Sequence, residues 1–305
     1  MTIFAHNVGD LIGNTPLLQM DGIYVKCEFM NPSGSIKARM MKHFIDTAET
    51  EGLLKPGDTI VEATSGNTGN ALAMLAAAKG YRALVLMPKG YSQERIAICR
   101  AYGAEVRFVG HFQLGEAVEE AKRLGKQEGF WCPCQFENQW KIDENSQWLG
   151  PEILDQLPED TTIDAIIQGV GTGGTLIGVG EALRDKHNAD IKLFAIEPAE
   201  SRTIGRGEVG QHLIEGISDG FVPPILERNR ELVDEVVVVK SEKAVATMKM
   251  LAAQYGILVG VSSGANFFAA KQILKTHPDI KTVLTFFCDA GEKYLMQYFG
   301  GGAPL

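Results

Sequence analysis

The segment Gly169-Val-Gly-Thr-Gly-Gly-Thr175 follows the apolar run Ala165–Gln168 and leads into the helical pattern Thr175–Asp185. A strand that ends in a glycine turn and continues as a helix is the repeating unit of parallel sheets. Short β-rich runs and longer helical patterns alternate in the same way on both sides of this segment. The alternation predicts an α/β fold, in which helices cover both faces of mainly parallel sheets.

The patterns define a set of expected elements, and several of the helices open at Ser, Thr or Asn caps. The expected strands are Ile23–Phe29, Thr59–Ala63, Ala83–Met87, Glu105–Val109, Ala165–Gln168, Lys192–Ile196, Glu235–Val239 and Thr282–Phe287. The expected helices are Ser35–Glu51, Asn67–Lys79, Ser92–Ala101, Leu114–Glu128, Thr175–Asp185, Glu242–Tyr255 and Gly264–Lys275.

The chain is long enough for two packed units. It has 305 residues, of which 45% are hydrophobic, and single cores usually stop growing at about 250–300 residues. The stretch Gln135–Gly150, rich in Trp, Asn and Gln, breaks the periodic pattern, so we interpret it as the crossing between two α/β halves. We expect an N-terminal domain over residues 1–140 and a C-terminal domain over residues 141–305, although residues 11–29 could pack on the second domain.

The charge balance excludes some classes of partner. The chain has 29 Lys and Arg against 38 Asp and Glu, a formal net charge of −9, which opposes binding to nucleic acids and to anionic membrane surfaces. The chain shows no secretory signal, and no apolar run approaches the roughly 18 residues that span a bilayer. We predict a cytoplasmic protein without nucleic-acid or membrane partners.

Five scattered cysteines do not resemble a disulfide framework, so we expect free thiols. Cys132-Pro-Cys134 could be a metal or redox pair, but its spacing is not C-x-x-C and no second pair of ligands accompanies it. The histidines also lack metal-binding spacings. The sequence therefore predicts no metal site.

Lys37 lies in Asn31-Pro-Ser-Gly-Ser-Ile-Lys37, which joins an expected strand to an expected helix and places a lysine on the first helical turns. A lysine that forms imines must be partly buried, because desolvation lowers its pKa and frees the amine. The alternative is an ordinary solvated lysine on an amphipathic helix. Burial decides between the two, and the sequence does not reveal it.

Two further segments place polar groups at helix N-termini. Glu62-Ala-Thr-Ser-Gly-Asn-Thr-Gly69 could bind a carboxylate there, or could be no more than a capped turn. Gly169–Thr175 could bind a phosphate through successive backbone N–H groups. It also fits the G-x-G-x-x-G pattern, with Glu197 near the position of a ribose-binding acid, so a dinucleotide site is the rival interpretation.

Taken together, the motifs resemble the cysteine synthase (O-acetylserine sulfhydrylase) family from about Ile12 to Tyr294. The motifs that carry the resemblance are Ile12-Gly-Asn-Thr-Pro-Leu17, Asn31–Lys37, Glu62–Gly69, Met87-Pro, Tyr102-Gly-Ala-Glu-Val106, Gly150-Pro-Glu152, Gly171-Thr-Gly-Gly-Thr175, Gly216-Ile-Ser-Asp-Gly-Phe221 and Val261-Ser-Ser-Gly264. The family uses pyridoxal 5′-phosphate (PLP) and has a tryptophan synthase β-like fold (fold type II). The resemblance implies two three-layer α/β domains with the cofactor in the cleft between them.

The resemblance also implies a role for each matching residue. Lys37 would carry PLP as a Schiff base and act as the base at Cα, and Asn67 would hydrogen-bond the ring hydroxyl. The phosphate would be held by Gly171, Thr172, Gly173, Gly174 and Thr175. The substrate carboxylate would be bound by Thr64, Ser65, Thr68 and Gln135, with Gly216 and Asp219 in a loop that borders the substrate. Cys288 would face the pyridine nitrogen, unless the adjacent Asp289 does so.

The implied reaction is β-replacement on a serine derivative, with cysteine made from O-acetylserine and sulfide, by a homodimer. Three departures from the family pattern are Ala38 after the lysine, Trp148-Leu149 before Gly150, and Asp219, which could orient a water molecule. Alternatives in the same chemistry are O-phosphoserine as substrate, favoured by Arg202 and Arg206, cysteine degradation that releases sulfide, and another β-substituted alanine. Alternatives in other classes are an NAD-binding dehydrogenase and a catalytically silent homologue.

Overall fold

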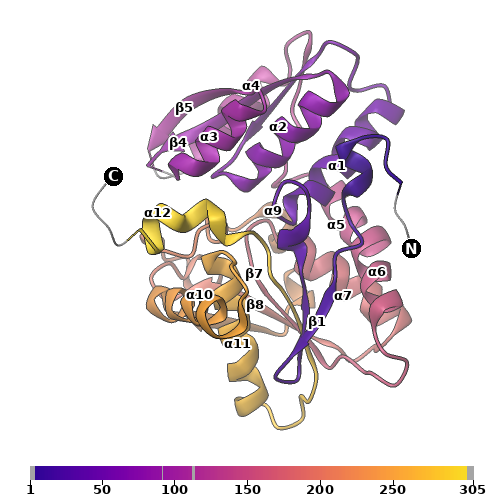
Figure 1. Ribbon diagram of the computed structural model, residues 1–305, viewed down its shortest axis with the longest axis vertical. Helices are drawn as coiled ribbons and strands as arrows, with labels where there is room; N and C mark the ends of the chain where they lie inside the picture. Colours follow the sequence, from indigo (N-terminus) through magenta and orange to yellow (C-terminus); the bar gives the residue numbers. More distant parts are fainter. Residues whose placement is uncertain (1–3, 91, 112–113, 301–305) are drawn as a thin grey trace.

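A computed structural model describes residues 4–90, 92–111 and 114–300. Figure 1 shows two α/β units, one above the other, each built around its own sheet. Within the larger sheet the strands run in the order β1-β2-β10-β7-β8-β9, and within the smaller sheet in the order β5-β4-β3-β6. Every pairing is parallel except that of β1 with β2. The predicted α/β fold with mainly parallel sheets is confirmed.

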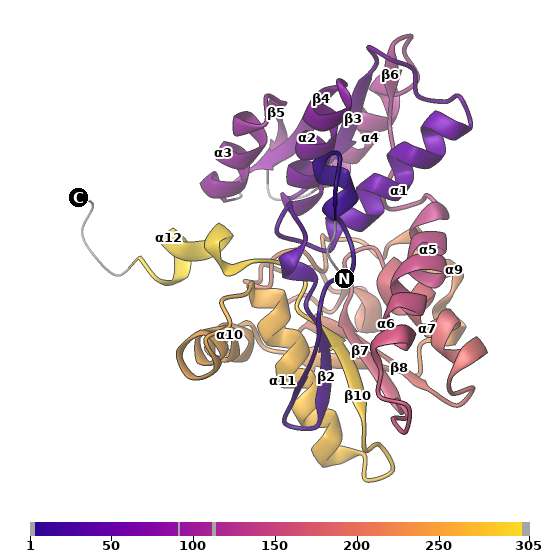
Figure 2. The same ribbon diagram turned by 45° about the vertical axis from the view of Figure 1, so that its right-hand side comes forward.

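The larger sheet combines the two ends of the chain. Its strands are β1 (Leu17–Met20), β2 (Ile23–Lys26), β7 (Ala165–Gly169), β8 (Lys192–Pro198), β9 (Glu235–Val239) and β10 (Val283–Phe286). The hairpin of β1 and β2 lies in the lower unit, beside β10 (Figures 1 and 2). Residues 17–26 therefore pack with the C-terminal strands, whereas a domain boundary at residue 140 stays a prediction.

The smaller sheet contains β3 (Thr59–Ala63), β4 (Arg82–Lys89), β5 (Glu105–His111) and β6 (Phe130–Trp131). Successive residues of a strand point to opposite faces. Ile60 accordingly packs with α1 (Lys37–Thr50), α2 (Asn67–Lys79) and α3 (Gln93–Ala101). Val61 packs on the other face, against α4 (Gly115–Leu124). The result is a three-layer unit.

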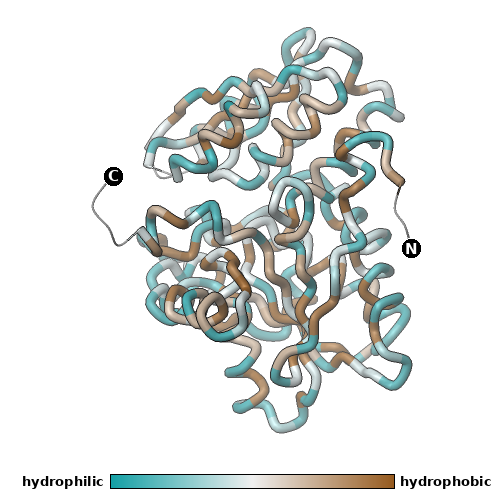
Figure 3. Tube along the Cα trace, viewed as in Figure 1, coloured by the Kyte–Doolittle hydropathy of each residue, from teal (hydrophilic) through white to brown (hydrophobic). Residues whose placement is uncertain are grey.

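The larger sheet is covered in the same way. Ile167 packs with α10 (Ser241–Tyr255) and α11 (Val261–Thr276). Its neighbour Ile166 packs with α6 (Gly150–Gln156) and α7 (Gly174–Lys186). In Figure 3 brown apolar segments run through the strands and the exposed turns are mostly teal. The shorter helices are α5 (Trp140–Glu144), α8 (Thr203–Arg206), α9 (Pro224–Arg228) and α12 (Leu295–Tyr298).

The stretch Gln135–Gly150 contains helices that the sequence pattern did not predict. This stretch does lead from one unit to the other, but from Trp140 it is helical, through α5, a π-helical turn at Asn145–Leu149 and α6. The helical period is hidden in the sequence because the inward-facing side chains include Lys141, Glu144 and Asn145, all of them buried. Polar residues in buried positions defeat a pattern based on hydrophobicity.

Arg39 is the centre of a buried ionic network that joins the two units. Its guanidinium donates to Glu28 Oε2 at 2.8 Å and to Glu152 Oε1 at 2.6 Å. Glu152 also accepts a hydrogen bond from Lys26 Nζ at 2.6 Å. The guanidinium carbon of Arg39 lies 5.0 Å from the ring centroid of Trp148, a cation–π contact. The departure at Trp148 therefore changes packing behind α1.

Among the described residues, no helix has the length and apolar character that crossing a membrane requires.

Candidate active site

Lys37 is the first residue of α1 and is half-buried. The turn before it passes through Gly34, whose φ of +67° favours glycine. The segment around Cys288 pairs with this turn, since Ile36 N donates to Cys288 O at 2.9 Å and Ser35 forms a β-bridge with Asp289. Residues about 250 positions apart in sequence thus meet beside the lysine.

The glycine turn after β7 forms an anion cradle. In the described part of the chain, the backbone N–H groups of Gly171, Thr172 and Gly173 donate to no protein acceptor. Gly173 has a φ of +88°, and a Cβ on Gly171 would lie 2.6 Å from Gly216 O, so both positions require glycine. Free N–H groups at the start of α7 match a phosphate. Gly174 directly follows these residues and is the first residue of α7.

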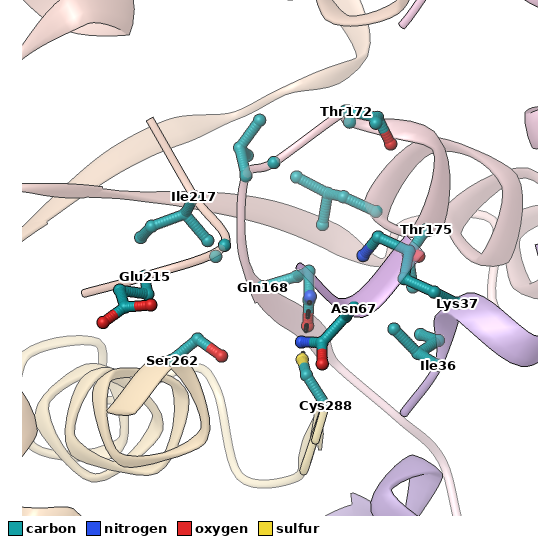
Figure 4. A pocket seen from close by; sticks show the side chains of 16 residues that line it. Ile36, Lys37, Asn67, Gln168, Thr172, Thr175, Glu215, Ile217, Ser262 and Cys288 are labelled. Carbon is teal, nitrogen blue, oxygen red and sulfur yellow. Dashed lines mark hydrogen bonds between the residues drawn. The ribbon is translucent and has the colours of Figure 1, made fainter. Parts of the chain in front are cut away.

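Lys37 and the glycine turn line the same cavity, of about 520 Å³. Figure 4 shows the side chains of Lys37, Asn67 and Cys288 entering it from three different segments. Other residues that line it are Gln168, Gly171, Thr172, Gly173, Thr175, Gly216 and Ser262. One small molecule in this cavity can touch both the amine and the anion cradle.

Cys288 and Asp289 have different positions in the site. Cys288 lines the cavity, and burial raises the pKa of its thiol to about 11, so the thiol is neutral at pH 7. Asp289 does not line it. Its carboxylate is buried and accepts hydrogen bonds from Asn67 Nδ2 at 2.7 Å and from Tyr294 OH at 2.6 Å. The neutral thiol is therefore the group that lies against the contents of the cavity.

A second cavity, of about 400 Å³, adjoins the first and shares Lys37, Asn67, Gly171, Thr172 and Gly216 with it. Every residue predicted to contact the substrate lines this cavity. These residues are Thr64, Ser65, Thr68, Gln135, Gly216 and Asp219. Thr68 Oγ1 donates to Gln135 Oε1 at 2.7 Å, so the two segments that supply these residues are joined. Burial raises the pKa of the Asp219 carboxyl.

The sequence analysis missed Arg95, which also lines the second cavity. Arg95 is buried and its guanidinium contacts Glu215 at 2.5 Å and lies 4.6 Å from the ring centroid of Tyr294. Lys293 was missed as well, although it is buried beside Asn67. Both are charged residues in buried positions, which a hydrophobic pattern does not predict. The only sequence signal for them is their location, Arg95 in Ser92–Arg95 and Lys293 in Cys288–Tyr294, near residues of the cofactor and substrate motifs.

The structure disfavours two of the alternatives. Glu197 is buried, and its Oε2 accepts hydrogen bonds from Ile204 N at 2.8 Å and Gly205 N at 3.1 Å, so it serves the adjacent loop. Arg202 and Arg206 line neither of the two cavities. Arg202 instead lies 3.7 Å from Glu197. No group of three or more His, Cys, Asp or Glu side chains within the described ranges is arranged to hold a metal ion.

A family model described as "Pyridoxal-phosphate dependent enzyme" matches residues 8–289. This chain belongs to that family. The site fits the cofactor, because the first cavity is lined both by the unpaired backbone N–H groups of Gly171–Gly173, which can bind a phosphate, and by the amine of Lys37. PLP is the cofactor of this enzyme, and the dinucleotide interpretation of the glycine turn was wrong.

Similar proteins of this pyridoxal-phosphate dependent family carry related names. A cysteine synthase of Staphylococcus aureus (strain Mu50 / ATCC 700699) is 43% identical over 298 residues, which is 95% of each chain. The crystal structure of an O-ureido-L-serine synthase matches with a TM-score of 0.91 and 36% identity over 99% of this chain and 98% of that one. A hydrogen sulfide-producing enzyme from Fusobacterium nucleatum matches with a TM-score of 0.88 and 36% identity over 97% and 99%.

Proposed function

We propose that this enzyme is a cysteine synthase, which replaces the acetoxy group on Cβ of O-acetylserine by sulfide to give cysteine and acetate. One observation carries the proposal. The cavity that adjoins the cofactor cavity is lined by Thr64, Ser65, Thr68 and Gln135, and Lys37 lies in the wall between the two. A substrate whose carboxylate binds these polar groups has its Cα next to Lys37. The cysteine synthase of Staphylococcus aureus supports the same assignment.

The cofactor would be held at three points. Lys37 would bind it covalently through its ε-amine, and Asn67 would contact its ring. Its phosphate would be held by the backbone N–H groups of Gly171–Gly173, by Thr175 and by the start of α7 at Gly174. When bound, PLP supplies an electron sink for the carbanion at Cα. The neutral thiol of Cys288, facing the ring nitrogen as the family resemblance implies, would not stabilise a protonated ring as a carboxylate would. Expulsion of a β-substituent is then favoured over transamination.

The chain itself carries out the proton transfers. The free ε-amine of Lys37 would remove the proton from Cα of the bound substrate, and the β-substituent would leave with the bonding electron pair. After the nucleophile has added at Cβ, Lys37 returns the proton to Cα. Thr68 and Gln135 keep the carboxylate in place throughout, because their side chains are bonded to each other at 2.7 Å.

A panel of substrates tests the proposal. The PLP-loaded enzyme is given O-acetylserine, O-phosphoserine or cysteine, each with and without sulfide, and acetate, phosphate, sulfide and cysteine are measured. We expect acetate and cysteine in equal amounts from O-acetylserine with sulfide, at a higher kcat/KM than any other pair. A loaded enzyme that releases no acetate contradicts the proposal and supports a catalytically silent homologue.

A second candidate function is cysteine degradation with release of sulfide, and Asp219 favours it. Asp219 lines the substrate cavity, and burial raises the pKa of its carboxyl, so it can act as a base toward a water molecule. The variant Asp219→Asn distinguishes the two functions. If water is the physiological nucleophile, sulfide release from cysteine falls about 100-fold while cysteine synthesis changes little. If sulfide is the nucleophile, synthesis dominates in both proteins.

The oligomeric state and the cellular location complete the proposal. We assign a homodimer in the cytoplasm, by resemblance to the cysteine synthase family. The five cysteines are free thiols, which agrees with a reducing compartment. Light scattering on the purified holoenzyme tests the dimer, and a mass of one chain at micromolar concentration contradicts it.

A further inference from the structure

The cysteine pair Cys132-Pro-Cys134 lies directly before Gln135 and has no part in the proposed reaction. The Sγ atoms of Cys132 and Cys134 lie 3.3 Å apart, within hydrogen-bond distance for sulfur, and both are free thiols. Both side chains are half-buried, in the segment that follows β6. Two thiols this close need only a small movement to form a bond, because the S–S distance of a disulfide is about 2.05 Å.

The backbone holds the two thiols together. Pro133 has a φ fixed near −65° by its ring, and Cys134 has a φ of +53°, which non-glycine residues rarely adopt. The chain therefore bends between the cysteines. The buried carboxylate of Glu62 stabilises this bend from below, since Gln135 N donates to Glu62 Oε2 at 3.1 Å.

The electrostatics make the two thiols unequal. The contact between them lowers the pKa of Cys134, and the nearby charge of Lys122 acts in the same direction, although burial and Glu137 oppose it. The same contact raises the pKa of Cys132. In exchange reactions of a dithiol, the thiol with the lower pKa is the one that attacks as a thiolate, and its neighbour resolves the mixed disulfide.

We infer that Cys132 and Cys134 form a redox-active dithiol whose oxidant is a small disulfide such as glutathione disulfide. The thiolate of Cys134 attacks one sulfur of the small disulfide, forms a mixed disulfide and expels one thiolate. Cys132 then loses its proton, attacks Cys134 Sγ and expels the second thiolate. The two cysteines are oxidised by two electrons, and the small disulfide is reduced to two thiols.

Oxidation is coupled to the substrate cavity through Gln135. Forming the bond shortens the Sγ–Sγ distance from 3.3 Å to about 2.05 Å and pulls on the residue that follows Cys134. Gln135 accepts from Thr68 Oγ1 at 2.7 Å and donates to Ala63 O at 2.8 Å, so its displacement disturbs the wall that faces the substrate carboxylate. This consequence rests on the proposed function, whereas formation of the disulfide does not.

Mass spectrometry of the holoenzyme tests the dithiol without any assay of activity. After treatment with glutathione disulfide, we expect the intact protein to lose the mass of two hydrogen atoms, and peptide mapping to place the bond between Cys132 and Cys134. Dithiothreitol reverses the change. The single variant Cys132→Ser keeps a glutathione adduct on Cys134, because no thiol resolves it. Wild-type protein that retains both free thiols, or carries only glutathione adducts there, overturns the inference.

Kinetics test the coupling to Gln135. In the oxidised holoenzyme we expect the KM for O-acetylserine to rise about tenfold, as for one misplaced hydrogen bond to the carboxylate, with kcat nearly unchanged. The double variant Cys132→Ser/Cys134→Ser, checked by circular dichroism for folding, does not respond to the oxidant. If the disulfide forms and the KM stays constant, the coupling is wrong. If the reduced enzyme does not use O-acetylserine at all, the proposed function is wrong. Mass spectrometry still shows, independently of activity, whether Cys132 and Cys134 form a disulfide.

Discussion

Lys293 Nζ donates a hydrogen bond to Asn67 Oδ1 at 2.8 Å, and these residues are 226 positions apart in sequence. The same ammonium group donates to Ser33 O at 2.9 Å and to Gly34 O at 3.0 Å, in the turn that precedes Lys37. Asn67 Nδ2 in turn donates to Asp289. These contacts hold both the Asn67 amide and the turn that precedes Lys37, so we assign Lys293 a positioning role.

The variant Lys293→Met should weaken cofactor binding, because it removes the donor that orients Asn67. We expect the dissociation constant of PLP from the apoenzyme to rise about tenfold, the effect of one charge-assisted hydrogen bond. Titration of the apoenzyme, followed by visible absorbance, measures it. Lys271→Met is the matched control, since Lys271 pairs with Asp21 at 3.0 Å on the surface. Equal dissociation constants for the two variants would count against the positioning role.

Lys37→Ala should abolish covalent attachment of the cofactor and catalysis at Cα. We expect the visible band of the holoenzyme to shift to that of unattached PLP, and turnover to fall by about 10³-fold or more, because Lys37 is the proposed base at Cα. Lys42→Ala serves as the control on the same helix, where Lys42 pairs with Asp46. A Lys37→Ala protein that kept the wild-type spectrum and turnover would exclude Lys37 from both roles.

The contribution of Glu152 to the free energy of unfolding should depend on pH. Burial alone raises the pKa of Glu152, but the hydrogen bonds and charges of Arg39 and Lys26 outweigh burial and lower the pKa to about 2. Since the ordinary pKa of a glutamate is 4.5, the contribution of Glu152 is fully present above pH 4.5 and is lost as the pH falls toward 2. Glu152→Gln should lower the free energy of unfolding at pH 7 by about 3–5 kcal/mol.

Urea unfolding of wild type and Glu152→Gln between pH 7 and pH 3 measures this effect. The difference between the two should shrink as the pH falls, because wild-type Glu152 becomes protonated. Glu242→Gln, a change at an exposed side chain, should match the wild type throughout. A difference that stays constant with pH would show that the charge of Glu152 is not what stabilises the network.

O-phosphoserine should be a poor substrate compared with O-acetylserine. Asp219 lines the substrate cavity and opposes a phosphate dianion, whereas Arg202 and Arg206 do not line it. The double variant Arg202→Ala/Arg206→Ala should therefore leave the ratio of kcat/KM for the two substrates unchanged. The ratio is measured from the rates of phosphate and acetate release. A selective loss of phosphate release in the variant would show that these arginines contact the phosphorylated substrate.

Local patterns predicted most of the elements around the site. Thr59–Ala63, Asn67–Lys79 and Glu235–Val239 agree with the structure at both ends, because apolar β-rich runs and an Ala-rich helical run that stops at the C-cap Gly80 are clear local signals. The hairpin strand Leu17–Met20 and the helix Trp140–Glu144 were missed. The first is short and only partly buried, and the second points polar side chains inward, so neither shows the expected period.

The sequence by itself determined the α/β class and the motifs by which the chain resembles its family, because each of these depends on residue types at short spacing. Only the tertiary structure decided that Lys37 and the glycine turn line one cavity, that Cys288 rather than Asp289 faces it, and that Lys293 orients Asn67. These relations join residues more than 100 positions apart. They arise because parallel strands from both ends of the chain pair in one sheet. A local sequence pattern does not predict which side chains this pairing brings together.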